Sequence, residues 1–144
     1  MRFWDPKHFD PWELVPPEIH QAKGEDSILA FDARILWTLD AIRDVYDRRV
    51  TVNTWHEGGK FSQRGFRTDP AMLLKTPLTQ HRFGRAVDFD IEGITPEQFR
   101  ADAREPKLAN VLQYVTRIEV GKEVTWNHVD CMAVPGTEIV FFTV

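Results

Sequence analysis

The longest amphipathic segment of the chain, residues 27 to 49, most constrains what it can fold into. Its apolar side chains recur at intervals of three and four residues, from Ile28 through Leu39 to Tyr46. This spacing places them along one face of an α-helix. Asp26 or Ser27 is suited to cap the first turn. The sequence therefore predicts one long helix that follows an N-terminal arm.

Shorter segments on either side of this helix predict an arm, strands and two further helices. Prolines mixed with aromatic residues in positions 1–24 predict an irregular arm packed on the body. The loop HEGGKFSQRGFRTDP is long enough to suggest a functional role. The other expected elements are strands at 50–55 and 86–91, helices at 95–103 and 108–115, and a three-stranded meander of RIEV, VTWNHVDCM and EIVFFTV. Residues 25–144 should thus form one α+β domain with a single sheet of antiparallel strands.

Composition and charge restrict the classes of partner. A chain of 144 residues with a net charge of −4 and a pI near 5.7 fits one globular domain and argues against nucleic acid. The N-terminal residues are broken by prolines and acids, so they predict neither a signal peptide nor a spanning helix. We expect a cytoplasmic monomer as synthesised, with no membrane partner. Because Cys131 is the single cysteine, any metal must be held by histidine and carboxylate.

Two polar segments, TQHRFGRAVDFD and TWNHVD, bring histidines and aspartates together. Side chains two residues apart in a strand share a face, so His128 should point the same way as Asp130. Gly84 permits a tight turn through which His81 folds back toward Asp88. Two histidines and a carboxylate with an open fourth position are the arrangement of catalytic zinc sites. The spacing alone favours the simpler interpretation, a turn histidine and a surface or helix-capping aspartate.

Taken together, the two segments resemble the motifs of zinc peptidases that include D-Ala-D-Ala carboxypeptidases and phage L-alanyl-D-glutamate endolysins. TQHRFGRAVDFD fills every fixed position of S/T-x-H-x-x-G-x-A-x-D, and TWNHVD fills W-x-H-x-D, in the expected order. The resemblance covers roughly residues 25 to 132. It implies the Hedgehog/DD-peptidase fold, an antiparallel sheet flanked by helices, with one zinc ion held by His81, Asp88 and His128.

The sequence departs from these peptidases at the general base, which moves a proton from the zinc-bound water to the leaving nitrogen. Many members place a glutamate three residues before the last zinc histidine, where this chain has Thr125. Glu119 and Glu123 are the alternatives. With a two-residue turn at 121–122, Glu119 pairs with Val124 and shares the face of the last histidine, whereas Glu123 is nearer but points away. Either glutamate also suits a solvated hairpin.

Five further residues are suited to supporting roles. Family members use an arginine of the loop region to hold a substrate carboxylate, which points to Arg67 and then to Arg64, although both also fit a solvated loop. His56 can line the same cleft or lie exposed. Asp130 is suited to orient a ligating histidine. Thr79 can bond the aspartate ligand or the backbone of the turn.

The sequence therefore predicts a zinc-dependent peptidase that cuts the stem peptide of bacterial peptidoglycan, as a carboxypeptidase or an endopeptidase. Such a protein suits a phage or prophage, which releases it to the wall by other means. Thr125 supports a different class, namely a zinc-stabilised binding or virion-structural protein that kept the fold without the base. A metal-free scaffold is a third alternative.

Overall fold

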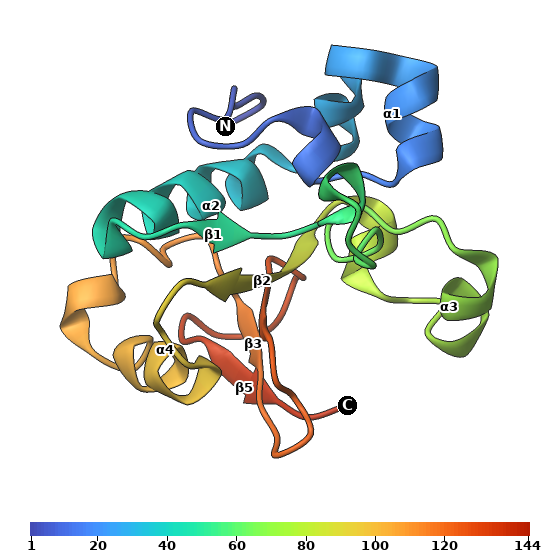
Figure 1. The fold of residues 1–144 in the computed structure, drawn as a ribbon. Helices are drawn as coiled ribbons and strands as arrows, with labels where there is room; N and C mark the ends of the chain where they lie inside the picture. The colour runs from blue at the N-terminus through green and yellow to red at the C-terminus, as the bar shows by residue number, and fades with distance from the viewer.

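In the computed structural model, which describes residues 1–144, one five-stranded sheet is surrounded by four α-helices (Figure 1). The helices are α1 (Pro17–Lys23), α2 (Ala33–Tyr46), α3 (Pro70–Lys75) and α4 (Pro96–Asp102). The strands are β1 (Val50–Thr51), β2 (Ala86–Ile91), β3 (Arg117–Glu119), β4 (Asn127–Asp130) and β5 (Val140–Phe142). Short 3-10 helices join them: η1 (Pro11–Glu13), η2 (Gly24–Ala30), η3 (Trp55–Glu57), η4 (Gln80–Phe83) and η5 (Pro106–Leu108). The predicted α+β class is confirmed. No helix has both the length and the apolar character needed to cross a membrane.

The predicted long helix is present, but it begins later than expected. α2 starts at Ala33, and the preceding turns form η2 instead. Asp32, not residue 26 or 27, caps the helix by accepting a hydrogen bond from the N–H of Arg34 at 3.0 Å. The N–H of Asp32 itself donates to the carbonyl of Gly84 at 2.9 Å. This long-range bond fixes where the helix starts, which local spacing could not show.

The strand at 86–91 and the helix at 95–103 are confirmed by β2 and α4. Thr95 caps α4, because its hydroxyl accepts a hydrogen bond from the first turn at 3.1 Å. β1 is shorter than the predicted strand, since only Val50 and Thr51 pair with β2. The chain then leaves the sheet, and the N–H of Asn53 donates to the carbonyl of Glu13 in the arm.

The predicted helix at 108–115 is wrong. After η5 the chain continues as turns up to residue 114. The apolar residues of this segment are nevertheless buried: Leu108, Val111, Leu112 and Val115. Their helical spacing is thus satisfied by irregular turns that present the same side chains to the core.

The C-terminal strands do not form the predicted antiparallel meander. The sheet order is β1-β2-β4-β3-β5, and β5 pairs with β3 in parallel, so the sheet is mixed. Arg117 of β3 pairs with Asp130 of β4. Continuing this register places Glu119 opposite His128, and the expected pairing of Glu119 with Val124 is wrong. The connection between β3 and β4 is longer than a two-residue turn.

The sheet has one apolar and one polar face. Paired residues of neighbouring strands point to the same side of a sheet, so each row of paired residues lies on one face. The apolar row of β2, β4, β3 and β5 is Val87, Val129, Ile118 and Phe141. The polar row beside it starts with Asp88 and His128 and continues with Glu119 and Phe142. The apolar row belongs to or packs against a core cluster of 22 buried residues that includes Leu39 of α2 and Phe99 of α4.

The N-terminal arm lies along α2 (Figure 1) and contributes Phe9, Leu14 and Val15 to the core. The arm contains η1 and α1, so it is less irregular than its prolines suggested. The indole of Trp4 donates a hydrogen bond to the buried carboxylate of Asp40 at 2.8 Å. The same carboxylate also accepts from two backbone N–H groups of the arm.

Candidate metal centre

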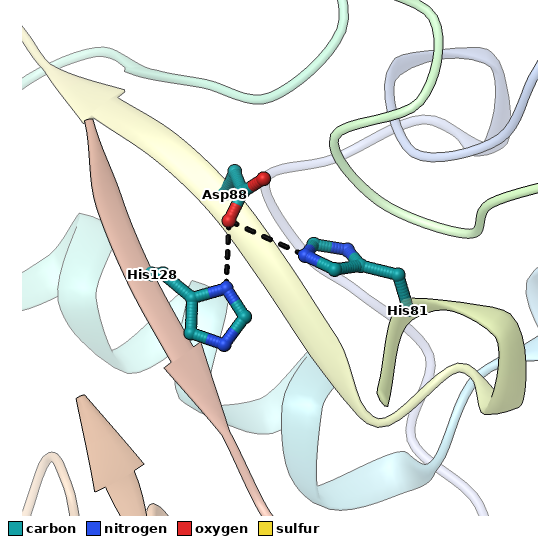
Figure 2. Close-up of side chains that lie close together, drawn as sticks. All are labelled: His81, Asp88 and His128. Carbon is teal, nitrogen blue, oxygen red and sulfur yellow. Dashed lines mark hydrogen bonds and ion pairs between the residues drawn. The ribbon is translucent and has the colours of Figure 1, made fainter. Parts of the chain in front are cut away.

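Three buried side chains from separate elements converge on the polar face of the sheet (Figure 2). Asp88 lies on β2, His128 lies opposite it on β4, and His81 comes from η4. Nδ1 of His128 is 2.7 Å from Oδ1 of Asp88, and Nε2 of His81 is 3.3 Å from the same oxygen. One ligand atom from each residue lies within 4.8 Å of the other two. The three residues expected from the sequence therefore lie together, and they form a group that could hold a metal ion.

The donor set fits a cation on chemical grounds. Nδ1 of His81 is 2.9 Å from the carbonyl of Gly65 and must donate to it, because a carbonyl can only accept. In the neutral ring, Nε2 of His81 then carries a lone pair directed at the Asp88 carboxylate. Two facing acceptors repel each other unless a proton or a metal ion lies between them. A ligand set of imidazole and carboxylate does not favour strictly soft or strictly hard metal ions. It suits zinc and the neighbouring transition metals.

Gly84 sets the position of His81 by closing η4 in the left-handed region at φ 66°. A Cβ at this position would collide with the carbonyl of Ala30. Gly84→Ala is therefore expected to lower the free energy of unfolding by about 2–3 kcal/mol, from backbone strain and overpacking together. Urea unfolding of the two proteins measures the difference.

Gly58→Ala is the matched control for this prediction. Gly58 has φ 81°, but no atom lies within 4 Å of its added Cβ. Gly58→Ala should therefore lower the free energy of unfolding by the backbone strain alone, about 1 kcal/mol. Equal losses in the two variants would show that the close approach of Gly84 to Ala30 contributes nothing to stability.

His128 lies between two carboxylates. Its Nδ1 faces Asp88, and its Nε2 is 3.1 Å from Oδ2 of Asp130. Without a metal both nitrogens donate, which requires the doubly protonated ring. With a metal on Nδ1, the Nε2–H bond to Asp130 remains and fixes the ring orientation. Asp130 thus lies beside His128, where it would orient the ring if His128 holds a metal.

Burial and charge act in opposite directions on these groups. Burial alone would raise the pKa of Asp88, but His81 and His128 hold it well below its usual range. Burial would lower the pKa of His128, yet hydrogen bonds to Asp130 and Asp88 raise it to about 9. Asp130 also has a lowered pKa, because His128 and Arg117 outweigh its burial. The centre is thus a coupled network in which the carboxylates stay charged.

Metal-free protein is expected to lose stability as the pH rises from about 6.5 toward 9. The pKa of His128 is raised to about 9 in the folded state, so its stabilising effect is complete below the unfolded value and disappears as the folded group deprotonates. The loss is at most about 3 kcal/mol. Asp88 has a lowered pKa, and its contribution is lost only in acid. Urea unfolding with a chelator at pH 6 and pH 9 measures the change, and equal stability at both values would contradict it.

A cleft of about 480 Å³ opens over the three residues. Its walls include the loop at 76–80, the indole of Trp126 and the C-terminal residues Phe142 and Val144. A second cavity, of about 640 Å³, shares Arg67, Asp88 and Trp126 with the first. The three residues are therefore accessible from the cleft, and a peptide would have room on both sides of Asp88.

The two candidate bases have different surroundings. Glu119 is buried with 8% exposure and lines the cleft together with His81 and His128. Glu123 is exposed in the connection between β3 and β4 and lines neither cavity. Thr125, at the position where many of the similar peptidases have glutamate, lines only the second cavity. Of the two candidates, only Glu119 lies in the cleft.

The candidate substrate residues are also separated by the structure. Arg67 lines both cavities, and its Nη2 lies 3.5 Å from Oδ2 of Asp88. Arg64 lines only the second cavity, where it pairs with Asp90 at 2.8 Å and lies over the ring of Phe61 at 4.4 Å from its centre. His56 lines neither cavity and packs against Trp55 instead. Thr79 lies in the cleft wall.

Sequence reasoning missed two residues of the centre, Arg117 and Phe142. Arg117 pairs with Asp130 through two nitrogens. The rings of Phe142 and His128 pack edge to face, with their centres 5.7 Å apart. The alternation in RIE already places Arg117 on the face of Glu119. This alternation does not identify Asp130 as the partner of Arg117, because the register predicted for β3 is wrong.

Comparison of the chain with models of protein families, with curated proteins and with solved structures finds no match in any of the three. The function therefore has to be argued from the centre itself and from the two motifs that build it.

Proposed function

We propose that this protein is a zinc-dependent peptidase that hydrolyses peptide bonds in the stem peptide of bacterial peptidoglycan. The observation that carries the proposal is the convergence of His81, Asp88 and His128 beneath an open cleft. These are the positions that the resemblance to the zinc peptidases assigns to the metal. By the same resemblance we infer the Hedgehog/DD-peptidase fold for residues 25–144.

The three side chains would hold zinc through Nε2 of His81, a carboxylate oxygen of Asp88 and Nδ1 of His128. Their burial keeps water from competing for these atoms, while the cleft above them leaves access for a substrate. A bound zinc ion would polarise the scissile carbonyl and lower the pKa of a water molecule to about 7.

Glu119 is the proposed general base. It lies opposite His128 on the polar face and shares the cleft with all three candidate ligands. A carboxylate there can accept a proton from a water molecule in the cleft and donate it to the leaving nitrogen. The base would then come from β3 instead of the usual position three residues before the last histidine, which is Thr125 here.

Arg67 is the proposed contact for a substrate carboxylate or carbonyl oxygen. Burial lowers its pKa, while Asp88 and Glu119 act in the opposite direction and favour its charged form. Its guanidinium borders both cavities, so a peptide lying across Asp88 passes within its reach. Arg64 is already satisfied by Asp90 and is left out of this role.

Digestion of purified peptidoglycan by the zinc-loaded protein tests the proposal. Mass spectrometry of the products should reveal new amino and carboxyl ends, and their masses identify which bond is cut and whether it is terminal or internal. His81→Ala should produce none. His8→Ala is the matched control, because His8 forms a surface pair with Asp44 and lines neither cavity.

Absence of new ends from a protein that carries stoichiometric zinc would overturn the peptidase proposal in favour of a zinc-stabilised binding protein. Absence of zinc from protein purified without chelators would overturn both of these functions.

A further inference from the structure

We propose that Arg117 is a positioning residue of the metal centre, which holds Asp130 so that His128 keeps its proton on Nε2 and presents the Nδ1 lone pair to the metal. The inference rests on the zinc site of the proposed function, and it adds a residue that no motif identified. Arg117 belongs to β3, outside both motifs.

The contact between Arg117 and Asp130 is a fork. Nη2 of Arg117 lies 2.6 Å from Oδ2 of Asp130, and Nε lies 3.0 Å from each carboxylate oxygen. Such a two-nitrogen contact fixes the plane of the carboxylate as well as its position. Arg117 and Asp130 are also paired residues of β3 and β4, so the backbone holds the fork in register.

Asp130 transmits this constraint to the histidine. Its side chain has no exposed surface, and Oδ2, the oxygen nearest Nη2 of Arg117, is also the one that faces Nε2 of His128 at 3.1 Å. The other oxygen accepts from the N–H of Met132 at 3.1 Å. A buried carboxylate with these partners can only accept, so it selects the form of His128 that carries hydrogen on Nε2.

The guanidinium of Arg117 also lies over the ring of Phe142 in β5. The charged carbon of Arg117 lies 4.3 Å from the centre of the Phe142 ring, and the same ring contacts His128 at 5.7 Å. Only 21% of the Arg117 side chain is exposed. Arg117 thus contacts both a carboxylate and an aromatic face, which restricts its rotamers. The series of side-chain contacts from Arg117 through Asp130 to His128 is therefore rigid.

Zinc affinity and the tautomer of His128 are the measurements that test this role. Arg117→Met removes the fork but keeps a long side chain, and it should weaken zinc binding by roughly 10- to 100-fold in competition with a chelator of known affinity. Arg117→Lys restores the charge without the fork and should recover only part of the affinity. Nitrogen chemical shifts of zinc-loaded protein should show His128 protonated on Nε2 in the native chain and a mixture of ring states in Arg117→Met.

Arg104→Met is the matched control. The guanidinium of Arg104 lies 3.7 Å from the ring of Phe141, the neighbouring residue of β5, so this variant also loses a charge and an aromatic contact. Arg104 lines neither cavity of the metal cleft, and its loss should leave zinc affinity unchanged. A double variant adds a second control: in an Asp130→Asn background, Arg117→Met should cost less than it does alone.

Native affinity and native His128 shifts in Arg117→Met would overturn the inference, as would a full additive loss in the Asp130→Asn background. If Arg117→Met fails to fold, Arg117→Lys decides, since a zinc affinity equal to the native value would show that the fork is unnecessary. Failure of the native protein to bind zinc would instead count against the proposed function, so the two failures are distinguishable.

Discussion

Substitution of His128 by alanine is expected to weaken zinc binding by roughly 100- to 1,000-fold. Structural zinc sites are worth about 10–16 kcal/mol over four ligands, or about 2.5–4 kcal/mol for each ligand. His128 contributes one of three protein ligand atoms here, and the two other residues cannot compensate from their buried positions. Competition against a chromogenic chelator at pH 7.5 measures the affinity, and elemental analysis of the purified variant measures the retained metal.

His8→Ala provides the comparison for this variant as well. His8 and Asp44 form a histidine–carboxylate pair at 2.6 Å, but on the surface and without a second histidine. Its loss should leave zinc affinity within about twofold of the native value, because a surface pair contributes little. A His128→Ala protein that keeps one zinc ion at native affinity, with the fold verified by circular dichroism, would exclude the proposed ligand set.

The candidate ligands were predicted from the resemblance of two sequence motifs, and local geometry accounts for how Asp88 and His81 are placed. The alternation of AVDFDI fixes which residues of β2 face the core, and Val87 and Phe89 then leave Asp88 on the polar side. Gly84 marks the turn that returns His81 to the strand. These short-range constraints place Asp88 and His81, whereas the pairing of β2 with β4 brings His128 opposite Asp88.

Glu119 and Arg117 could not be placed because their positions depend on strand register. A two-residue turn was assumed at 121–122, and that assumption displaced Glu119 along the sheet from His128. In the structure the connection is longer, so no turn type dictates the pairing. The register is set instead by contacts across the sheet, among them the fork between Arg117 and Asp130. The residues that complete the centre are therefore the ones that local reasoning misplaced.

Helical periodicity predicted burial better than it predicted secondary structure. The segment at 108–115 has apolar residues at helical spacing, and these are buried although the chain forms turns. In the same way α2 was predicted from its apolar face, but its start is determined by the bond from Asp32 to Gly84. Apolar spacing reports which side chains face the core, whereas the hydrogen bonds that begin or end a helix depend on distant residues.

Replacement of Glu119 by glutamine is expected to lower the rate of peptide hydrolysis by roughly 100- to 10,000-fold while zinc affinity stays within a few-fold of the native value. Glutamine keeps the shape of the side chain but cannot accept a proton in the cleft. Because Glu119 is opposite His128 and is not one of the three candidate ligands, its loss should affect kcat more than metal binding. Rates on a stem-peptide substrate, measured with zinc content verified for each sample, give the comparison.

Glu123→Gln separates the two candidate bases. Glu123 is exposed and outside both cavities, so its replacement should leave the rate within about twofold of the native protein. A normal rate in Glu119→Gln together with a large loss in Glu123→Gln would require the connection between β3 and β4 to fold over the cleft during catalysis. Normal rates in both variants would exclude a glutamate base from this hairpin. Proton transfer would then have to come from another group in the cleft, and the position of Glu119 opposite His128 would be a feature of the sheet and not of the reaction.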